Sequence, residues 1–170
     1  MSEIAVKRKP FIVGIMGSHI CDDSSLKDAY ALGEEIARRG YVLLTGGGTG
    51  VMKAASKGAH RAGGLVIAVL PSERQRPLAG YPNDFVDIPI YTGMYDARNI
   101  INAKTPHVIV ALSGGPGTLS EMAIALKSGT PVIAFNAPRF ELPETSRLFS
   151  VTTVDEAIQK IDEILATAKE

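Results

Sequence analysis

The chain has 170 residues, 18 acidic and 18 basic side chains, and 45% hydrophobic residues. This length suits one domain with one core, and the composition excludes a disordered chain, a coiled coil and a collagen-like rod. The zero formal net charge argues against a dedicated nucleic-acid-binding protein, which usually carries a basic excess.

The cysteine and histidine content excludes several kinds of site. Cys21 is the single cysteine, so no disulfide can form within the chain. The three histidines are far apart in the sequence, so we expect no structural metal site. No apolar run reaches the ~20 residues of a membrane-spanning helix, and no cleavable leader is recognisable. We therefore expect a cytoplasmic protein with no membrane partner.

Five apolar runs rich in valine and isoleucine predict five strands. None of them alternates polar and apolar residues, which is typical of strands buried on both faces of a parallel sheet. In chain order the runs are Phe11–Met16, Tyr41–Leu44, Leu65–Leu70, His107–Leu112 and Pro131–Phe135.

Helical patterns separate these strands. We expect Ser24 or Ser25 to cap the first helix and Gly40 to stop it. A second helix follows Thr49, and a third runs from about Gly93 to Lys104. The apolar face of the first helix consists of Leu26, Ala29, Tyr30, Gly33, Ile36 and Ala37.

Two more helices are predicted further along the chain. The fourth opens at Thr118, and Thr153 with Glu156 forms a capping box for the last. The expected apolar stripe of the fourth helix is Leu119, Met122, Ala123 and Leu126. The last helix is expected to bury Ile158, Ile161, Ile164 and Leu165.

Strands alternating with helices predict a Rossmann-like, doubly wound α/β sheet with helices on both faces and right-handed crossovers. We expect a single domain over residues 1–170, with a flexible tail over residues 1–9 that contains the basic run Lys7–Lys9. Residues 71–84 and 137–148 interrupt the alternation as long loops, which are either binding elements or surface excursions.

Three of the predicted strands end in glycine-containing loops. Residues 42–50 read VLLTGGGTG and residues 110–118 read VALSGGPGT, and the first strand adds Gly14–His19. Glycine removes the Cβ that would hold a ligand away from the backbone, and the N–H groups at the start of the following helix favour an anion.

These loops predict a site for a phosphate-bearing small molecule. In a sheet of order 3-2-1-4-5 they would line one crevice at the carboxyl edge; alternatively, the glycines only make tight turns. Neither a Walker motif nor the GxGxxG of an NAD site is present, so we expect no NAD. The residues expected to bind the ligand from these loops are Gly17, Ser18, Thr45, Gly46, Gly47, Gly48, Ser113, Gly114, Gly115, Gly117 and Thr118.

Two charged residues, Arg98 and Glu121, are expected near these loops. Glu121 either completes a capping box with Thr118 or faces the crevice, where a carboxylate can act as general acid or base or stabilise an oxocarbenium-like sugar. Arg98 is either a surface residue, a partner of Glu121, or a binding group for a phosphate or carboxylate.

Three segments resemble the Lonely Guy family, the cytokinin-activating phosphoribohydrolases that are often labelled lysine decarboxylase-like. Residues 113–121 (SGGPGTLSE) resemble the PGGxGTxxE motif, residues 94–99 (MYDARN) resemble the segment that carries the active-site arginine, and residues 45–52 (TGGGTGVM) match another signature. The resemblance covers about Phe11 to Phe135 and implies a Rossmann-like fold in homo-oligomers, dimeric or tetrameric.

The same resemblance implies roles for individual residues. Gly115, Gly117 and Thr118 would hold a 5′-phosphate. Arg98 and Glu121 would be the catalytic pair for N-glycosidic cleavage of a nucleoside 5′-monophosphate.

The chain departs from the family where the base is recognised. Asn99 follows Arg98 where lysine is usual, Ser113 replaces proline, only Ala123–Thr130 separates the motif from Pro131, and tryptophan is absent. These features resemble a short subgroup that includes the molybdenum cofactor (Moco) carrier proteins of algae and cyanobacteria. That resemblance implies a protein that binds the phosphate-bearing pterin cofactor as cargo, protects it and exchanges it with a donor or acceptor enzyme.

The carrier is our first expectation, because the phosphate loops are present and the base-recognition segment is not. The second is a Lonely Guy-type hydrolase of cytokinin riboside 5′-monophosphate or AMP. The third is a nucleotide-sensing module; one relative binds single-stranded DNA, but neutral charge and few aromatic residues argue against nucleic acid here. No lysine is placed to form a Schiff base, so we expect no PLP.

Overall fold

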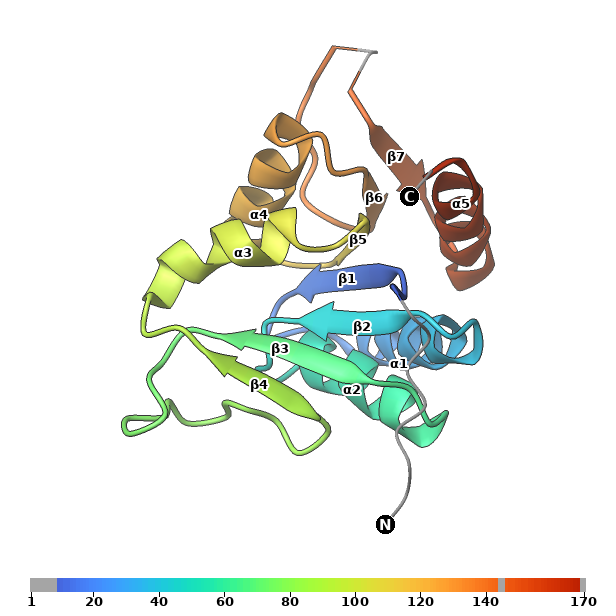
Figure 1. The fold of residues 1–170 in the computed structure, drawn as a ribbon. Coiled ribbons are helices and arrows are strands. Elements are labelled where there is room, and N and C mark those ends of the chain that lie inside the picture. Colours follow the sequence, from blue (N-terminus) through green and yellow to red (C-terminus); the bar gives the residue numbers. More distant parts are fainter. Residues whose placement is uncertain (1–8, 144–145, 169–170) are drawn as a thin grey trace.

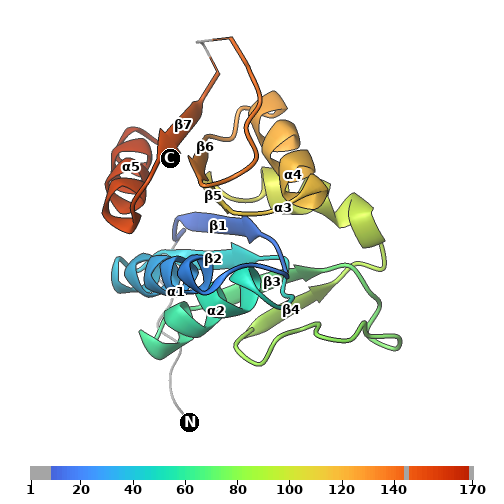
Figure 2. The same ribbon diagram turned by 180° about the vertical axis from the view of Figure 1, so that it is seen from behind.

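The computed structural model of the chain describes residues 9–143 and 146–168. A central sheet carries helices on both of its faces (Figure 1), and Figure 2 shows the same three layers from behind. This confirms the predicted Rossmann-like, doubly wound α/β sheet. Residues 1–8, which make up most of the expected tail, lie outside the described residues.

All five predicted strands are present, and no end is shifted by more than one residue. They are β1 (Ile12–Gly17), β2 (Val42–Thr45), β3 (Val66–Leu70), β5 (Val108–Leu112) and β6 (Val132–Phe135). The sequence did not predict β4 (Ile88–Tyr91) or β7 (Leu148–Val151). Both are short edge strands, and β4 leaves Ile88 and Ile90 exposed, so neither forms a continuous buried run.

The strands are parallel and follow the order β4-β3-β2-β1-β5-β6-β7. The five predicted strands therefore have the expected order 3-2-1-4-5. Val13 of β1 pairs with Leu43 of β2 on one side and with Val108 of β5 on the other, which places β1 at the centre. The winding direction reverses between β1 and β5, so the loops after these strands meet at the carboxyl edge of the sheet.

The helices divide between the two faces of the sheet. They are α1 (Asp23–Arg38), α2 (Val51–Arg61), α3 (Asn99–Lys104), α4 (Pro116–Lys127) and α5 (Val154–Thr167), with a 3₁₀ turn η1 (Tyr95–Arg98) before α3. Helices α1, α2 and α5 share a buried cluster with Ile15, whereas α3 and α4 share another with Met16, as the alternating sides of a strand require. Within the described ranges, none of the helices combines the length and apolar character needed to cross a membrane.

Three predicted helix starts were wrong, and one of them is that of α4, which begins at Pro116 and not at Thr118. Asp22, not Ser24 or Ser25, caps α1, because its carboxylate accepts a hydrogen bond from the backbone N–H of Ser25 at 2.8 Å. A continuous third helix cannot begin at Gly93, because Gly93 and Tyr95 have φ angles of 62° and 49°, in the left-handed region. The segment instead passes through η1 before α3 begins.

The predicted buried face of α4 was right only in part, for Met122 and the partly buried Leu126, whereas that of α5 was right. Leu119 and Ala123 of α4 are exposed. The face of α4 that is buried consists of Thr118, Glu121, Met122 and Ala125. In α5 the buried residues include the four expected ones, Ile158, Ile161, Ile164 and Leu165. Thr153 caps α5 as predicted, since its side chain accepts from the N–H of Glu156 at 3.2 Å.

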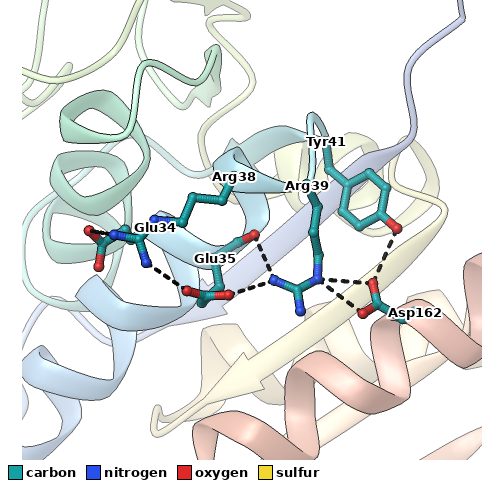
Figure 3. A network of polar contacts seen from close by, with 6 residues as sticks. All are labelled: Glu34, Glu35, Arg38, Arg39, Tyr41 and Asp162. Carbon is teal, nitrogen blue, oxygen red and sulfur yellow. Dashed lines mark hydrogen bonds and ion pairs between the residues drawn. The ribbon is translucent and has the colours of Figure 1, made fainter.

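A polar network joins α1 to α5 (Figure 3). Arg39, which follows α1, donates from Nε to both carboxylate oxygens of Asp162 at 3.0 and 3.2 Å, and from Nη1 to Glu35 at 2.6 Å. Tyr41 donates its hydroxyl to the same Asp162 at 3.2 Å. These side chains remain partly exposed, so the network orients α5 without a buried charge.

Candidate functional site

A cleft of about 320 Å³ opens at the carboxyl edge of the sheet, above the ends of β1, β2 and β5. It lies where the winding direction reverses, which is where open α/β sheets commonly bind ligands. The lining residues are Met16, Gly17, Ser18, His19, Gly46, Met52, Tyr81, Asp96, Arg98, Asn99, Gly115, Pro116, Gly117, Thr118 and Glu121.

The cleft brings together residues from all three predicted glycine loops. The predicted site residues that line it are Gly17, Ser18, Gly46, Arg98, Gly115, Gly117, Thr118 and Glu121. The remaining five, which do not line it, are Thr45, Gly47, Gly48, Ser113 and Gly114. Thr45 is fully buried, and its hydroxyl accepts a hydrogen bond from the N–H of Gly47 at 3.0 Å, so it shapes the loop after β2 from below.

The loop after β5 presents an uncapped helix start to the cleft. Ser113 and Gly114 have φ angles of 54° and 127°, which turn the chain sharply into α4. The N-cap is Gly115, and no side chain caps the helix. A Cβ added at Gly115 or Gly117 would meet no atom within 4 Å. The space beside Gly115 and Gly117 is therefore open, and the first N–H groups of α4 have no side-chain cap, an arrangement that suits a phosphate or other anion.

The other two glycine loops approach the cleft through glycines that no larger residue could replace without displacement. A Cβ at Gly17 would lie 2.5 Å from the carbonyl oxygen of Leu112. A Cβ at Gly46 would lie 2.5 Å from Nη1 of Arg98. Both glycines allow chain segments from different strands to come close together at the floor of the cleft.

Arg98 is buried at the end of η1 and is held by backbone carbonyls. Its Nη1 donates to the carbonyl oxygen of Gly46 at 2.9 Å and to that of Val69 at 2.6 Å. Within the described part of the chain, Nε and Nη2 of Arg98 form no hydrogen bond, so they remain for a ligand. Arg98 is thus neither a surface residue nor an ion-pair partner of Glu121 in the described structure.

Glu121 faces the cleft and does not cap α4. The helix begins at Pro116, so Thr118 already lies within its first turn, and the capping-box interpretation is wrong. The side chain is buried, and Oε1 accepts from Nδ2 of Asn102 at 3.0 Å. Burial raises the pKa of Glu121 to about 7, against the opposing effects of the Asn102 hydrogen bond and the positive charge of Arg98. Near neutral pH this carboxyl group can therefore hold or release a proton.

Several lining residues were not predicted from the sequence. Tyr81 comes from the long loop over residues 71–84, and its ring centroid lies 5.9 Å from Cζ of Arg98. His19 and Asn99 are sequence neighbours of predicted residues, and Asn99 donates to Ser120 at 3.1 Å. The length of the 71–84 loop was the one feature of the sequence that indicated a binding role for the segment containing Tyr81. Over the described ranges, no group of three or more histidine, cysteine, aspartate or glutamate residues is placed to hold a metal ion.

Comparisons with known proteins show the family and the fold. The sequence model described as the SLOG cluster4 family matches residues 10–164. A molybdenum cofactor binding protein from Rippkaea orientalis is 38% identical, with a TM-score of 0.85 over 94% of this chain and 99% of that one. The molybdenum cofactor carrier protein of Chlamydomonas reinhardtii is 37% identical, with a TM-score of 0.81 over 94% of this chain and 100% of the other.

A more distant relative belongs to the phosphoribohydrolases. Cytokinin riboside 5′-monophosphate phosphoribohydrolase LOG of Oryza sativa subsp. japonica is 36% identical over 96 residues. That match covers 55% of this chain and only 38% of the rice protein. The similarity to the carrier proteins thus extends over nearly the whole of both chains, whereas the similarity to the hydrolase is partial.

Proposed function

The chain belongs to the SLOG cluster4 family, and from that premise we propose that it binds, stores and hands on the molybdenum cofactor. The observation that carries this proposal is the near-complete overlap with two proteins named for that cofactor. The uncapped N-terminus of α4 and the buried Arg98 offer the N–H groups and the positive charge that bind the phosphate of such a cargo.

We assign the cargo an orientation within the cleft. Its phosphate lies against the N–H groups of Gly117 and Thr118 and the free guanidinium nitrogens of Arg98. The pterin extends toward Ser18 and Gly46. The residues given an indirect role, shaping the loops behind these contacts, are Thr45, Gly47, Gly48, Ser113 and Gly114. A cleft of about 320 Å³ is at the small end of the range for small-molecule sites, so part of the cargo extends out of it.

A second candidate function is hydrolysis of a nucleoside 5′-monophosphate. The observation that favours it is the pair Arg98 and Glu121 in one cleft, with the pKa of Glu121 near 7, where a general acid is effective. Against it, the chain matches only 38% of the rice hydrolase's length.

We also propose that the carrier is a single-domain protein that forms homo-oligomers, dimeric or tetrameric, and exchanges its cargo with a donor or acceptor enzyme in the cytoplasm. The large apolar side chains exposed around η1 and the starts of α3 and α4 support a subunit interface there; they are Met94, Tyr95, Ile100 and Leu119. The single cysteine is compatible with a reducing compartment.

Cofactor loading tests the carrier function. The purified protein is incubated with molybdenum cofactor freshly released from a molybdoenzyme, and the molybdenum that stays with the protein on gel filtration is measured. We expect saturable loading that Arg98→Ala weakens strongly and that Arg74→Ala, which removes an exposed arginine outside the cleft, leaves intact. An absence of saturable loading by the wild type would refute the proposal.

Base release from AMP distinguishes the second candidate. The carrier proposal predicts no adenine release by the wild-type protein or by Glu121→Gln. Turnover by the wild type, lost in Glu121→Gln with phosphate binding retained, would establish the hydrolase instead.

A further inference from the structure

A second groove lies outside the cleft, between α1 and α2. Its volume is about 640 Å³, and it is lined by Leu26, Lys27, Tyr30, Gly50, Lys53, Ala54 and Lys57. Leu26, Tyr30 and Ala54 make its floor apolar. Three lysines stand around that floor, so the groove combines an apolar base with a positively charged rim.

Two glycines set the geometry of this groove. A Cβ at Gly33 of α1 would overlap the carbonyl of Ala55, and one at Gly58 of α2 would overlap that of Tyr30. The helices therefore touch backbone to backbone at this crossing. Apart from Gly50, which precedes α2, the lining residues lie on α1 and α2, and the core fixes the positions of these two helices.

The charge of the rim is largely uncompensated. Lys53 pairs with Asp84 at 3.3 Å, but that aspartate is 81% exposed, and such pairs contribute little. Within the described residues, neither Lys27 nor Lys57 forms an ion pair. A second copy of the chain placed on this groove by a two-fold axis would bring like charges together, which is unfavourable. A partner with carboxylates complements the rim.

The groove adjoins the cleft. Gly50 lines the groove, and a Cβ there would lie 2.7 Å from the backbone of His19, which lines the cleft. The next residue, Ile20, is 78% exposed although it is a large apolar side chain. A protein seated in the groove would therefore contact the rim through which cargo enters and leaves.

We propose that this groove is the docking surface for an acidic segment, with apolar side chains among its carboxylates, on the enzyme that exchanges cargo with the cleft. The carboxylates pair with Lys27, Lys53 and Lys57, and the apolar side chains cover Leu26 and Tyr30. The identity of what is exchanged rests on the proposed carrier function, whereas the chemistry of docking rests on the groove itself.

The test uses a short fluorescein-labelled peptide in which glutamates are interspersed with leucines, and a matched peptide with lysines in place of the glutamates. Fluorescence anisotropy is measured for the wild type, for Lys27→Glu/Lys57→Glu, and for Lys104→Glu/Lys127→Glu. The last variant makes the same charge change on α3 and α4, away from the groove. Circular dichroism confirms that each variant is folded.

We expect the acidic peptide to bind the wild type and the Lys104/Lys127 variant with equal affinity, and the Lys27/Lys57 variant at least about tenfold more weakly. Added salt should weaken the binding. Equal binding to all three proteins, no binding to any, or equal binding of the lysine peptide would overturn the proposal.

Two further readouts separate the alternatives. Sedimentation of the same variants reports subunit association; dissociation caused only by Lys27→Glu/Lys57→Glu would mean that a second copy occupies the groove, and the proposal would be wrong. Cofactor loading is measured in parallel. If neither the wild type nor any variant loads cofactor while peptide binding behaves as expected, the carrier function is refuted and the docking surface is still supported.

Discussion

Nη1 of Arg98 donates to the carbonyl oxygen of Gly46 at 2.9 Å, and a Cβ at position 46 would lie 2.5 Å from that same nitrogen. The arginine therefore occupies the space that any side chain at position 46 would need. Arg98 is buried, and within the described residues its Nε and Nη2 form no hydrogen bond. The guanidinium group, which comes from η1 and lines the cleft, can take this position because Gly46 in the loop after β2 has no side chain. The position of the charged Arg98 side chain therefore depends on the absence of a side chain at Gly46.

The first prediction concerns Gly46→Ala. The added methyl group displaces the guanidinium, so cofactor affinity should fall at least about tenfold, which corresponds to about 1.4 kcal/mol. Titration of the cofactor against wild type, Gly46→Ala, Arg98→Ala and the double variant measures the coupling. Because both changes act on one guanidinium, the double variant should bind no more weakly than Arg98→Ala alone. Additive losses would show that Gly46 acts by a separate route.

The second prediction concerns Gly117→Ala. A Cβ at this position meets no protein atom within 4 Å and replaces a helical glycine, so stability should stay unchanged or rise by up to about 1 kcal/mol. If a phosphate lies at the start of α4, the same methyl group takes up its space, and affinity should fall about tenfold or more. Denaturant unfolding and cofactor titration measure the two effects. Unchanged affinity would place the phosphate elsewhere.

The glycine loops explain how much of the site could be predicted. A buried strand followed by glycines and a helix places N–H groups at the carboxyl edge whatever the rest of the chain does, so Gly17, Gly46 and Gly117 were found. Tyr81 reaches the cleft only through the path of the 71–84 loop, for which the sequence has no simple code. The position of Glu121 depended on where α4 begins. Pro116, a residue type favoured at the first helical position, was the signal that could have decided it.

The strands, too, include some that the sequence predicted and some that it did not. Strands buried on both faces, such as β1 and β5, are continuous apolar runs, and their boundaries followed from hydropathy alone. The edge strands β4 and β7 are only partly buried, so their identity depends on pairing with a neighbour that composition does not reveal. The stripe of α4 was misplaced because one face of that helix serves the cleft as well as the core.

The third prediction concerns the network of Figure 3. The side chains of Arg39 and Asp162 are 30% and 43% exposed, so their pairing should contribute no more than about 1 kcal/mol to the free energy of unfolding. A double-mutant cycle with Arg39→Ala and Asp162→Ala, measured by urea unfolding, gives the coupling energy. The coupling should shrink in high salt. A coupling well above this value would mean that α5 is held mainly by charge and not by its buried isoleucines.

The last prediction concerns Glu121 and pH. Burial raises its pKa in the folded protein to about 7 from an ordinary value of 4.5, so between these pH values the folded state holds a proton that the unfolded state has lost. The stabilisation is fully present below about pH 4.5, declines as the pH rises, and is lost once the pH passes about 7. Glu121→Gln keeps an uncharged group of the same shape, so relative to wild type it should gain up to about 3 kcal/mol between pH 5 and pH 8.

Urea unfolding at both pH values measures this difference, with Glu141→Gln, an exposed glutamate far from the cleft lining, as the control. The control should show no such gain. If Glu121→Gln and wild type keep the same stability difference at both pH values, the carboxyl group stays ionised in the cleft. The expected increase in the pKa of Glu121 on folding would then be wrong, and the group would not hold a proton near neutral pH.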